Sequence, residues 1–135
     1  MDLTALPRVT FTDPALAAVG LSEAEARKCH AEGVRTATLS LSAVPKALAA
    51  QDTRGALKIV VDGKGTVLGL HILAPEAGDA LQEGILAVKF GLNYQDLVDT
   101  FHPYLTLAEG IRLVAQTLDV DQTLDRDVKQ LSCCA

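Results

Sequence analysis

Two apolar segments around a short glycine-containing connection constrain the fold of this chain more than any other feature. Residues 56–61 and 66–73 are rich in Leu, Ile and Val, and Asp62-Gly63-Lys64-Gly65 separates them. Glycine supplies the positive φ angles that tight turns require, and β-branched residues favour strands. The sequence therefore predicts an antiparallel β-hairpin at residues 56–73.

Shorter strands and a series of helices surround this hairpin. Alternating patterns predict strands at residues 8–12 and 34–41, and a short apolar piece lies at 17–20. Ser22 and Glu25 form a capping box for a helix that should end near Gly33. Helical periodicity predicts further helices at residues 48–50, 76–90, 94–101 and 107–118. Strands followed by helices indicate an α+β domain, with an antiparallel β-sheet flanked by helices.

The length and charge of the chain limit its possible functions. A chain of 135 residues is one domain's worth and can bury a single core. We expect a globular domain at residues 1–118 and a tail at 119–135 that begins with a stretch rich in Asp and Gln. The formal net charge is -5 and the basic residues are scattered, which argues against a nucleic-acid-binding surface.

Membrane insertion and secretion are equally unsupported. The apolar stretch 55–73 is interrupted by Lys58, Asp62, Lys64 and His71, so it falls short of the ~20 apolar residues of a membrane span. The first residues lack the basic and then apolar build of a secretory signal. Three cysteines, two of them adjacent, offer no disulfide framework, so we expect the protein in the reducing cytoplasm.

The most chemically informative residues are Cys133 and Cys134, next to the last residue of the chain. Adjacent Cα atoms lie ~3.8 Å apart, shorter than the usual span of a disulfide, so a bridge between them would be strained. Thiolates are ligands for soft metals, and two near a chain end can reach outward. The pair predicts a dithiol that captures a thiophilic ion, or else exposed thiols with no task. Prenylation is excluded, because Ser132 occupies the position where that motif requires cysteine.

The remaining soft-ligand candidates carry weaker signals. Cys29 should lie on the first helix, where only the adjacent His30 could join it and that residue faces elsewhere. We interpret His30 and His71 as structural. The sequence has no G-x-G-x-x-G, Walker, H-E-x-x-H, serine-elbow or C-x-x-C motif. If the cysteine pair takes part in redox chemistry, its electron donor must therefore lie elsewhere. The chain is then either a fragment of a larger enzyme or a stand-alone carrier.

Residues 9–14 and 19–26 are followed, further along the chain, by a G-x-H-x-x-A pattern at 69–74 and by Ala77-Gly78. In this order, over roughly residues 8–118, they resemble the dimerisation domain of the pyridine nucleotide-disulfide oxidoreductases, the family of glutathione reductase and lipoamide dehydrogenase. Further segments are similar to the mercuric reductase branch of that family: 44–49, 52–55, 74–78, 103–106 and the ending 127–135.

The resemblance implies a function for the parent enzyme. Such an enzyme passes hydride from NADPH through FAD to a cysteine pair that holds Hg(II), and releases Hg(0). It implies a homodimer in which Cys133 and Cys134 bind Hg(II) and deliver it to the active site of the partner subunit. The FAD and NADPH domains have no counterpart in these residues, so we expect the fragment to bind Hg(II) and dimerise without reducing it. The alternatives are a non-enzymatic soft-metal carrier and the dimerisation domain of a thiol-disulfide reductase.

The resemblance also assigns a role to Tyr104. Most members carry H-P-T-x-x-E, in which the histidine is an acid-base group oriented by the glutamate five residues later. Five residues after His102 is Leu107, whereas Tyr104 keeps this spacing to Glu109, so Tyr104 takes the place of the histidine. Reduction of Hg(II) has no thiol leaving group to protonate, and a phenol oxygen can still contact the metal. We predict catalytic roles for Tyr104 and Glu109 and Hg(II) ligation by Tyr104, Cys133 and Cys134.

A structural interpretation of the same segment is also open. Thr106-x-x-Glu109 is itself a capping-box pattern for the helix that follows, and Glu109 has no further task in that case. On the same interpretation His102 caps or packs a turn.

Overall fold

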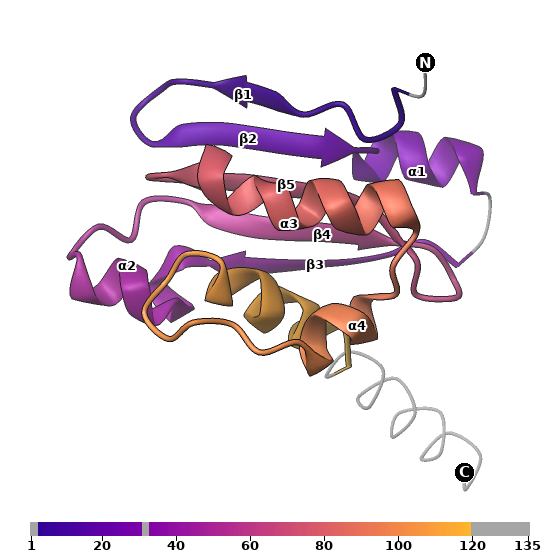
Figure 1. Ribbon diagram of the computed structural model, residues 1–135. Helices are drawn as coiled ribbons and strands as arrows, with labels where there is room; N and C mark the ends of the chain where they lie inside the picture. Colours follow the sequence, from indigo (N-terminus) through magenta and orange to yellow (C-terminus); the bar gives the residue numbers. More distant parts are fainter. Residues whose placement is uncertain (1–2, 31–32, 120–135) are drawn as a thin grey trace, which may run out of the picture.

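An antiparallel sheet of five strands forms the body of the domain (Figure 1). The computed structural model describes residues 3–30 and 33–119. The strands are β1 (Arg8–Thr10), β2 (Ala15–Gly20), β3 (Arg35–Ser40), β4 (Ala56–Val61) and β5 (Val67–Ala74), in the order β1-β2-β5-β4-β3. The helices are α1 (Glu23–Cys29), η1 (Leu41–Ala43), α2 (Pro45–Ala49), α3 (Ala77–Phe90) and α4 (Tyr94–Asp99), and residues 109–119 are also helical. The predicted α+β class is confirmed.

The predicted hairpin is β4 and β5, at the centre of the sheet. Its turn is closed by the carboxylate of Asp62, which accepts hydrogen bonds from the backbone N–H groups of Lys64 (2.9 Å) and Thr66 (2.8 Å). Gly65 has φ +89°, and a Cβ there would lie 2.9 Å from the ring of Tyr94. Both the backbone conformation and the close packing therefore require glycine at this position.

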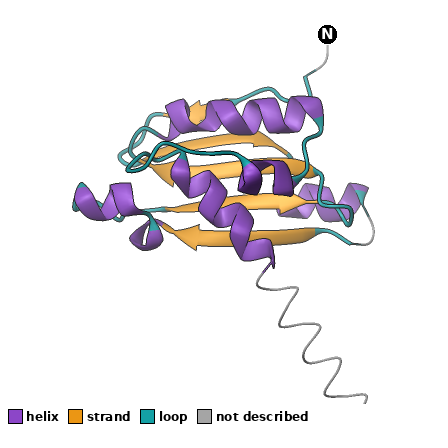
Figure 2. Ribbon diagram, turned by 60° about the horizontal axis from the view of Figure 1, so that its bottom comes forward, coloured by secondary structure: helices purple, strands orange, loops and turns teal. Residues whose placement is uncertain are grey.

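The two faces of the sheet are covered differently. Val19, Ile59 and Leu70 lie on one face, where they are at most 1% exposed. Figures 1 and 2 show α3 and residues 109–119 side by side on this face. Val60 points to the opposite face and forms a separate small cluster with Ala26 of α1 and Val34. The main core, and with it the residues around Tyr104, therefore lies on the α3 side of the sheet.

Several element ends differ from the sequence prediction. Helix α1 ends at Cys29, where the N–H of His30 donates to the carbonyl of Ala26, rather than near Gly33. Helix α2 begins at Pro45, before the predicted start, because the fixed φ of proline suits a first helical position. Helix α4 ends at Asp99, since both the N–H and the hydroxyl of Thr100 bond the carbonyl of Asp96.

Among the helices of the described residues, none has the combination of length and apolar character needed to cross a bilayer.

Candidate functional site

Tyr104 belongs to the loop formed by residues 100–106, between α4 and helix 109–119. Its side chain is 73% exposed, and that of Phe101 is 94% exposed. Leu105 follows with φ +60°, a conformation that a non-glycine residue seldom adopts. The loop therefore presents two aromatic side chains to the exterior, on a backbone that is locally strained.

Hydrogen bonds fasten both ends of this loop. Thr100 is bonded to the last turn of α4, as described above. At the other end, the hydroxyl of Thr106 donates to the carbonyl of Pro103 (2.8 Å) and accepts from the N–H of Glu109 (3.3 Å). The turn that carries Tyr104 is thus closed directly onto the start of the following helix.

His102 points inward, unlike its aromatic neighbours. The ring is 4% exposed. Its Nε2 lies 2.8 Å and 3.0 Å from the two carboxylate oxygens of Glu83 on α3, and its Nδ1 donates to the carbonyl of Thr100 (3.0 Å). The structure thus places His102 in the wall of the domain and Tyr104 on its surface.

Glu109 is in the first turn of helix 109–119. Its N–H forms the first half of the predicted capping box, through the bond to Thr106. Its Oε2 atom is buried and has no hydrogen-bond partner among the described residues. An unpaired buried carboxylate oxygen costs free energy, so a pure capping role leaves this oxygen unexplained.

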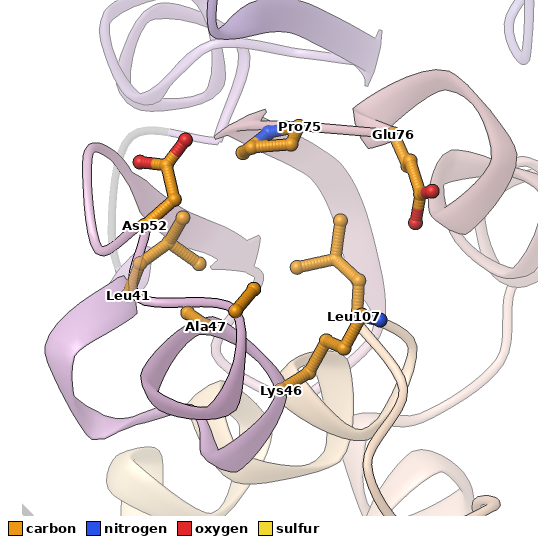
Figure 3. A pocket seen from close by; sticks show the side chains of 8 residues that line it. Leu41, Lys46, Ala47, Asp52, Pro75, Glu76 and Leu107 are labelled. Atoms are coloured by element: carbon orange, nitrogen blue, oxygen red, sulfur yellow. The ribbon is translucent and has the colours of Figure 1, made fainter.

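A small pocket lies beside the segment that follows Tyr104 (Figure 3). Its volume is about 150 Å³, and its walls are formed by Leu41, Lys46, Ala47, Ala50, Asp52, Pro75, Glu76 and Leu107. Figure 3 shows Asp52 and Glu76 on opposite sides of the apolar side chains of Leu41 and Leu107. Hydrogen bonds from the Arg54 side chain and backbone lower the pKa of Asp52 to about 2, so its carboxylate is ionised at neutral pH and paired with Arg54 at 2.8 Å.

The sequence of this chain carries no dinucleotide-binding motif of the kind that holds FAD or NADPH. Two further pockets have volumes of about 240 and 310 Å³. The larger of the two is lined by the His102–Glu83 pair, by Asp96 and Thr100, and by apolar side chains. No glycine-rich phosphate-binding loop is present in the sequence.

His71 and Cys29, two further candidate ligands among the described residues, lie in β5 and α1, away from the Tyr104 loop in the chain. His71 is half-buried on the sheet and its Nε2 is 3.1 Å from the carbonyl of Leu21, as expected for a structural residue. Cys29 is exposed at the end of α1. In the part of the chain that the structure describes, no three His, Cys, Asp or Glu residues are grouped so that they could hold a metal ion. Cys133 and Cys134 lie outside the described residues.

Glu83 is the residue that sequence reasoning missed. It is 19 positions from His102 in the chain, and its place on α3 resembles that of any solvated helical carboxylate. Only the inward orientation of His102 brings the two side chains together. The interpretation that His102 packs a turn is consistent with its inward orientation, but the sequence did not identify Glu83 as its partner.

Comparisons with known proteins place this geometry in context. Residues 6–115 match the family described as pyridine nucleotide-disulphide oxidoreductase, dimerisation domain. The whole chain is 49% identical to mercuric reductase of Shigella flexneri, 49% identical to that of Acidithiobacillus ferrooxidans and 46% identical to that of Staphylococcus aureus. The chain spans only 23–24% of the length of these relatives.

Two solved structures share the fold. The HOCl-induced flavoprotein disulfide reductase RclA from Escherichia coli has a TM-score of 0.77 and 28% identity, over 84% of this chain and 26% of that one. LpdA from Mycobacterium tuberculosis has a TM-score of 0.80 and 26% identity, over 87% of this chain and 26% of that one.

Proposed function

Because the chain belongs to the pyridine nucleotide-disulphide oxidoreductase family, as its dimerisation domain, we propose that it is the dimerisation and Hg(II)-relay domain of a mercuric reductase. The observation that carries this proposal is the 49% identity to mercuric reductases along the entire chain, against 28% to a flavoprotein disulfide reductase. The parent enzyme reduces Hg(II) to Hg(0) with NADPH and FAD, as a homodimer. Residues 1–118 form its dimerisation domain, and residues 119–135 are the tail that carries the thiols.

The relay step is an exchange of ligands on Hg(II). The thiolates of Cys133 and Cys134 attack the incoming ion, and each bond that they form replaces a bond to an earlier ligand. Each thiol releases its proton on binding, and the mercury remains Hg(II) throughout. Two adjacent donors keep the ion bound while it passes to the cysteine pair of the partner subunit.

Tyr104 supports this step from the surface of the domain. Its side chain is 73% exposed, and within the described residues its hydroxyl makes no hydrogen bond that would compete with a metal ion. The phenol oxygen therefore serves as a weak additional ligand for Hg(II) at the partner's active site. Glu109, whose buried Oε2 has no hydrogen-bond partner among the described residues, lies at the base of the same loop and assists Tyr104.

The reducing groups belong to other parts of the parent enzyme. This chain has no sequence motif for FAD or NADPH, so we assign to it the handling of Hg(II). We place the parent enzyme in the cytoplasm, since three cysteines with two adjacent give no disulfide framework.

Titration of Hg(II) into the reduced chain tests this proposal. The Cys133→Ala, Cys134→Ala double variant should bind Hg(II) far more weakly than the unmodified chain, because it loses a chelating pair of thiolates. Cys29→Ala is the matched control, since it removes a single exposed thiol and should leave the tight site intact. Equal affinity of the double variant and the unmodified chain would contradict the relay role.

A further inference from the structure

The middle of the Tyr104 loop is tied to the rest of the domain by one inward side chain. His102 is 4% exposed, whereas Phe101 and Tyr104 on either side are 94% and 73% exposed. The contact that His102 makes with Glu83 joins the loop to helix α3, 19 residues earlier in the chain.

The imidazole of His102 is held from two sides. A carbonyl oxygen only accepts, so Nδ1 donates to the carbonyl of Thr100 at 3.0 Å. On the other side, Nε2 lies between the two carboxylate oxygens of Glu83, at 2.8 Å and 3.0 Å. When each ring nitrogen carries a proton, both contacts are hydrogen bonds from N–H to an oxygen acceptor, the one to the carboxylate is the stronger, and together they fix the plane of the ring.

Glu83 is a firm anchor because α3 is packed tightly on the sheet. Its neighbours Leu81 and Ala87 are fully buried. Gly84 approaches strand β5 so closely that a Cβ there would lie 2.5 Å from the side chain of Leu70. The carboxylate of Glu83 is therefore held by a rigid element, which can fix the position of whatever bonds to it.

Apart from this contact, the side-chain hydrogen bonds that fasten the loop within the described part of the chain are at its ends, at Thr100 and at Thr106. Tyr104 lies between them and has an exposed ring that packs little against the domain. The backbone next to it is strained at Leu105, with φ +60°, and such a conformation persists only where its surroundings impose it. The Thr106–Pro103 hydrogen bond closes the turn around Leu105, and the contact at His102, two residues before Tyr104, ties that turn to α3.

We propose that His102 and Glu83 are positioning residues, which hold the loop so that Tyr104 presents its phenol oxygen to the ion in the partner's active site. The need for that orientation rests on the proposed function of Tyr104. The positional effect of the pair on Tyr104 does not, and it can be measured separately.

Fluorine NMR of the chain labelled with 3-fluorotyrosine measures the positional effect. The chain has two tyrosines, and Tyr94 is 6% exposed, so it is an internal reference. Glu83→Gln and His102→Gln should each shift or broaden the Tyr104 resonance and leave that of Tyr94 in place. The double variant should add nothing, because both single variants break the same contact. Asp99→Asn, an exposed carboxylate beside the loop, is the matched control and should move neither signal.

An unchanged Tyr104 resonance in both single variants would overturn the positioning role. Either variant alone is sufficient for this test, so the test still stands if the other variant fails to fold.

The companion measurement is Hg(II) reduction by the parent enzyme. Glu83→Gln should lower kcat/KM about 10- to 100-fold, as for other residues that orient a metal ligand, and should lower it no further in a Tyr104→Phe background. If Tyr104→Phe leaves turnover unchanged while the fluorine signal still moves, the function proposed for Tyr104 fails and the positioning role stands.

Discussion

The turn at residues 62–65 and the loop at residues 100–106 both reverse the chain, but they are built from different kinds of residue. In the first, Gly65 takes the positive φ angle and the carboxylate of Asp62 satisfies two backbone N–H groups. In the second, Leu105 takes a positive φ angle, and Phe101 and Tyr104 are exposed. The turn at residues 62–65 therefore has neither a strained non-glycine residue nor an exposed aromatic side chain, whereas the loop at residues 100–106 has both.

This difference separates a turn that serves the fold from a loop to which we assign a function. Glycine and aspartate are the residues that turns favour, because they reach the required conformations at little cost. A strained leucine and exposed aromatic side chains cost free energy without any return in the isolated domain. The costly loop is the one that carries Tyr104, the residue to which we assign mercury chemistry.

The largest effect is expected at Gly65. Gly65→Ala should lower the free energy of unfolding by about 2–4 kcal/mol, since it adds both left-handed strain and a clash with the Tyr94 ring. Denaturant unfolding measures this loss. Gly63→Ala is the control, because a Cβ there meets its nearest atom at 3.4 Å and should cost less than about 1 kcal/mol. Equal losses at the two glycines would break the account of the first turn.

The next effect separates function from stability at the two tyrosines. Tyr104→Phe should lower kcat/KM for Hg(II) in the parent enzyme by about 10- to 100-fold and change the free energy of unfolding by less than about 0.5 kcal/mol. Tyr94→Phe should do the reverse, because it loses the hydrogen bond from its hydroxyl to Asp119 (2.7 Å) and costs about 1–2 kcal/mol. Steady-state kinetics and denaturant unfolding of both variants would show these opposite effects on activity and stability. A Tyr104→Phe enzyme with full activity would contradict the role assigned to Tyr104.

A smaller effect is expected at Asp62. Asp62→Ala should cost about 1–2 kcal/mol, since two backbone N–H groups lose their acceptor. Burial raises the pKa of Asp62, but hydrogen bonds from Thr66 and Lys64 outweigh burial and the net pKa is lowered. A lowered pKa stabilises the fold above the unfolded-state value of ~3.9 and ceases to do so as the pH falls through the folded-state value.

Unfolding of the Asp62→Ala variant and the unmodified chain at several pH values checks this sign. The difference between them should be complete at pH 6 and should decrease below about pH 4. A difference that grows in acid would show that the carboxylate has been assigned the wrong role.

The smallest effect is expected at Leu105. Leu105→Gly relieves the strain at φ +60° but increases the freedom of the unfolded chain, so the free energy of unfolding should change by less than about 1 kcal/mol. Denaturant unfolding of Leu105→Gly and Gly65→Ala under the same conditions compares their free energies of unfolding directly. A loss above 2 kcal/mol on the same scale would mean that the side chain of Leu105 supports the fold.

Local patterns explain which parts of this structure were predictable. The central hairpin follows from two apolar runs around a glycine turn, and the capping box of Ser22 and Glu25 forms as its spacing predicts. The sheet order was not predicted, because β2 pairs with β5 across some fifty residues that carry no pairing signal of their own.

The site was predictable in part for the same reason. The spacing from Tyr104 to Glu109 is local, whereas the contact of His102 with Glu83 depends on how α3 and the loop pack against each other. The unpaired oxygen of Glu109 likewise follows from burial, which the sequence of a helix start does not specify. The roles of Tyr104, Glu109, Cys133 and Cys134 stay predictions.

Mixed dimers of the parent enzyme test the central claim, that this domain serves the active site of the partner subunit. One subunit carries Tyr104→Phe, Cys133→Ala and Cys134→Ala, and the other has this domain intact but lacks its redox-active cysteine pair. Each homodimer should be nearly inactive in NADPH-dependent Hg(II) reduction, and the mixed dimer should regain about half the activity of the unmodified dimer, since one of its two composite sites is complete. A mixed dimer as inactive as either homodimer would contradict the relay between subunits.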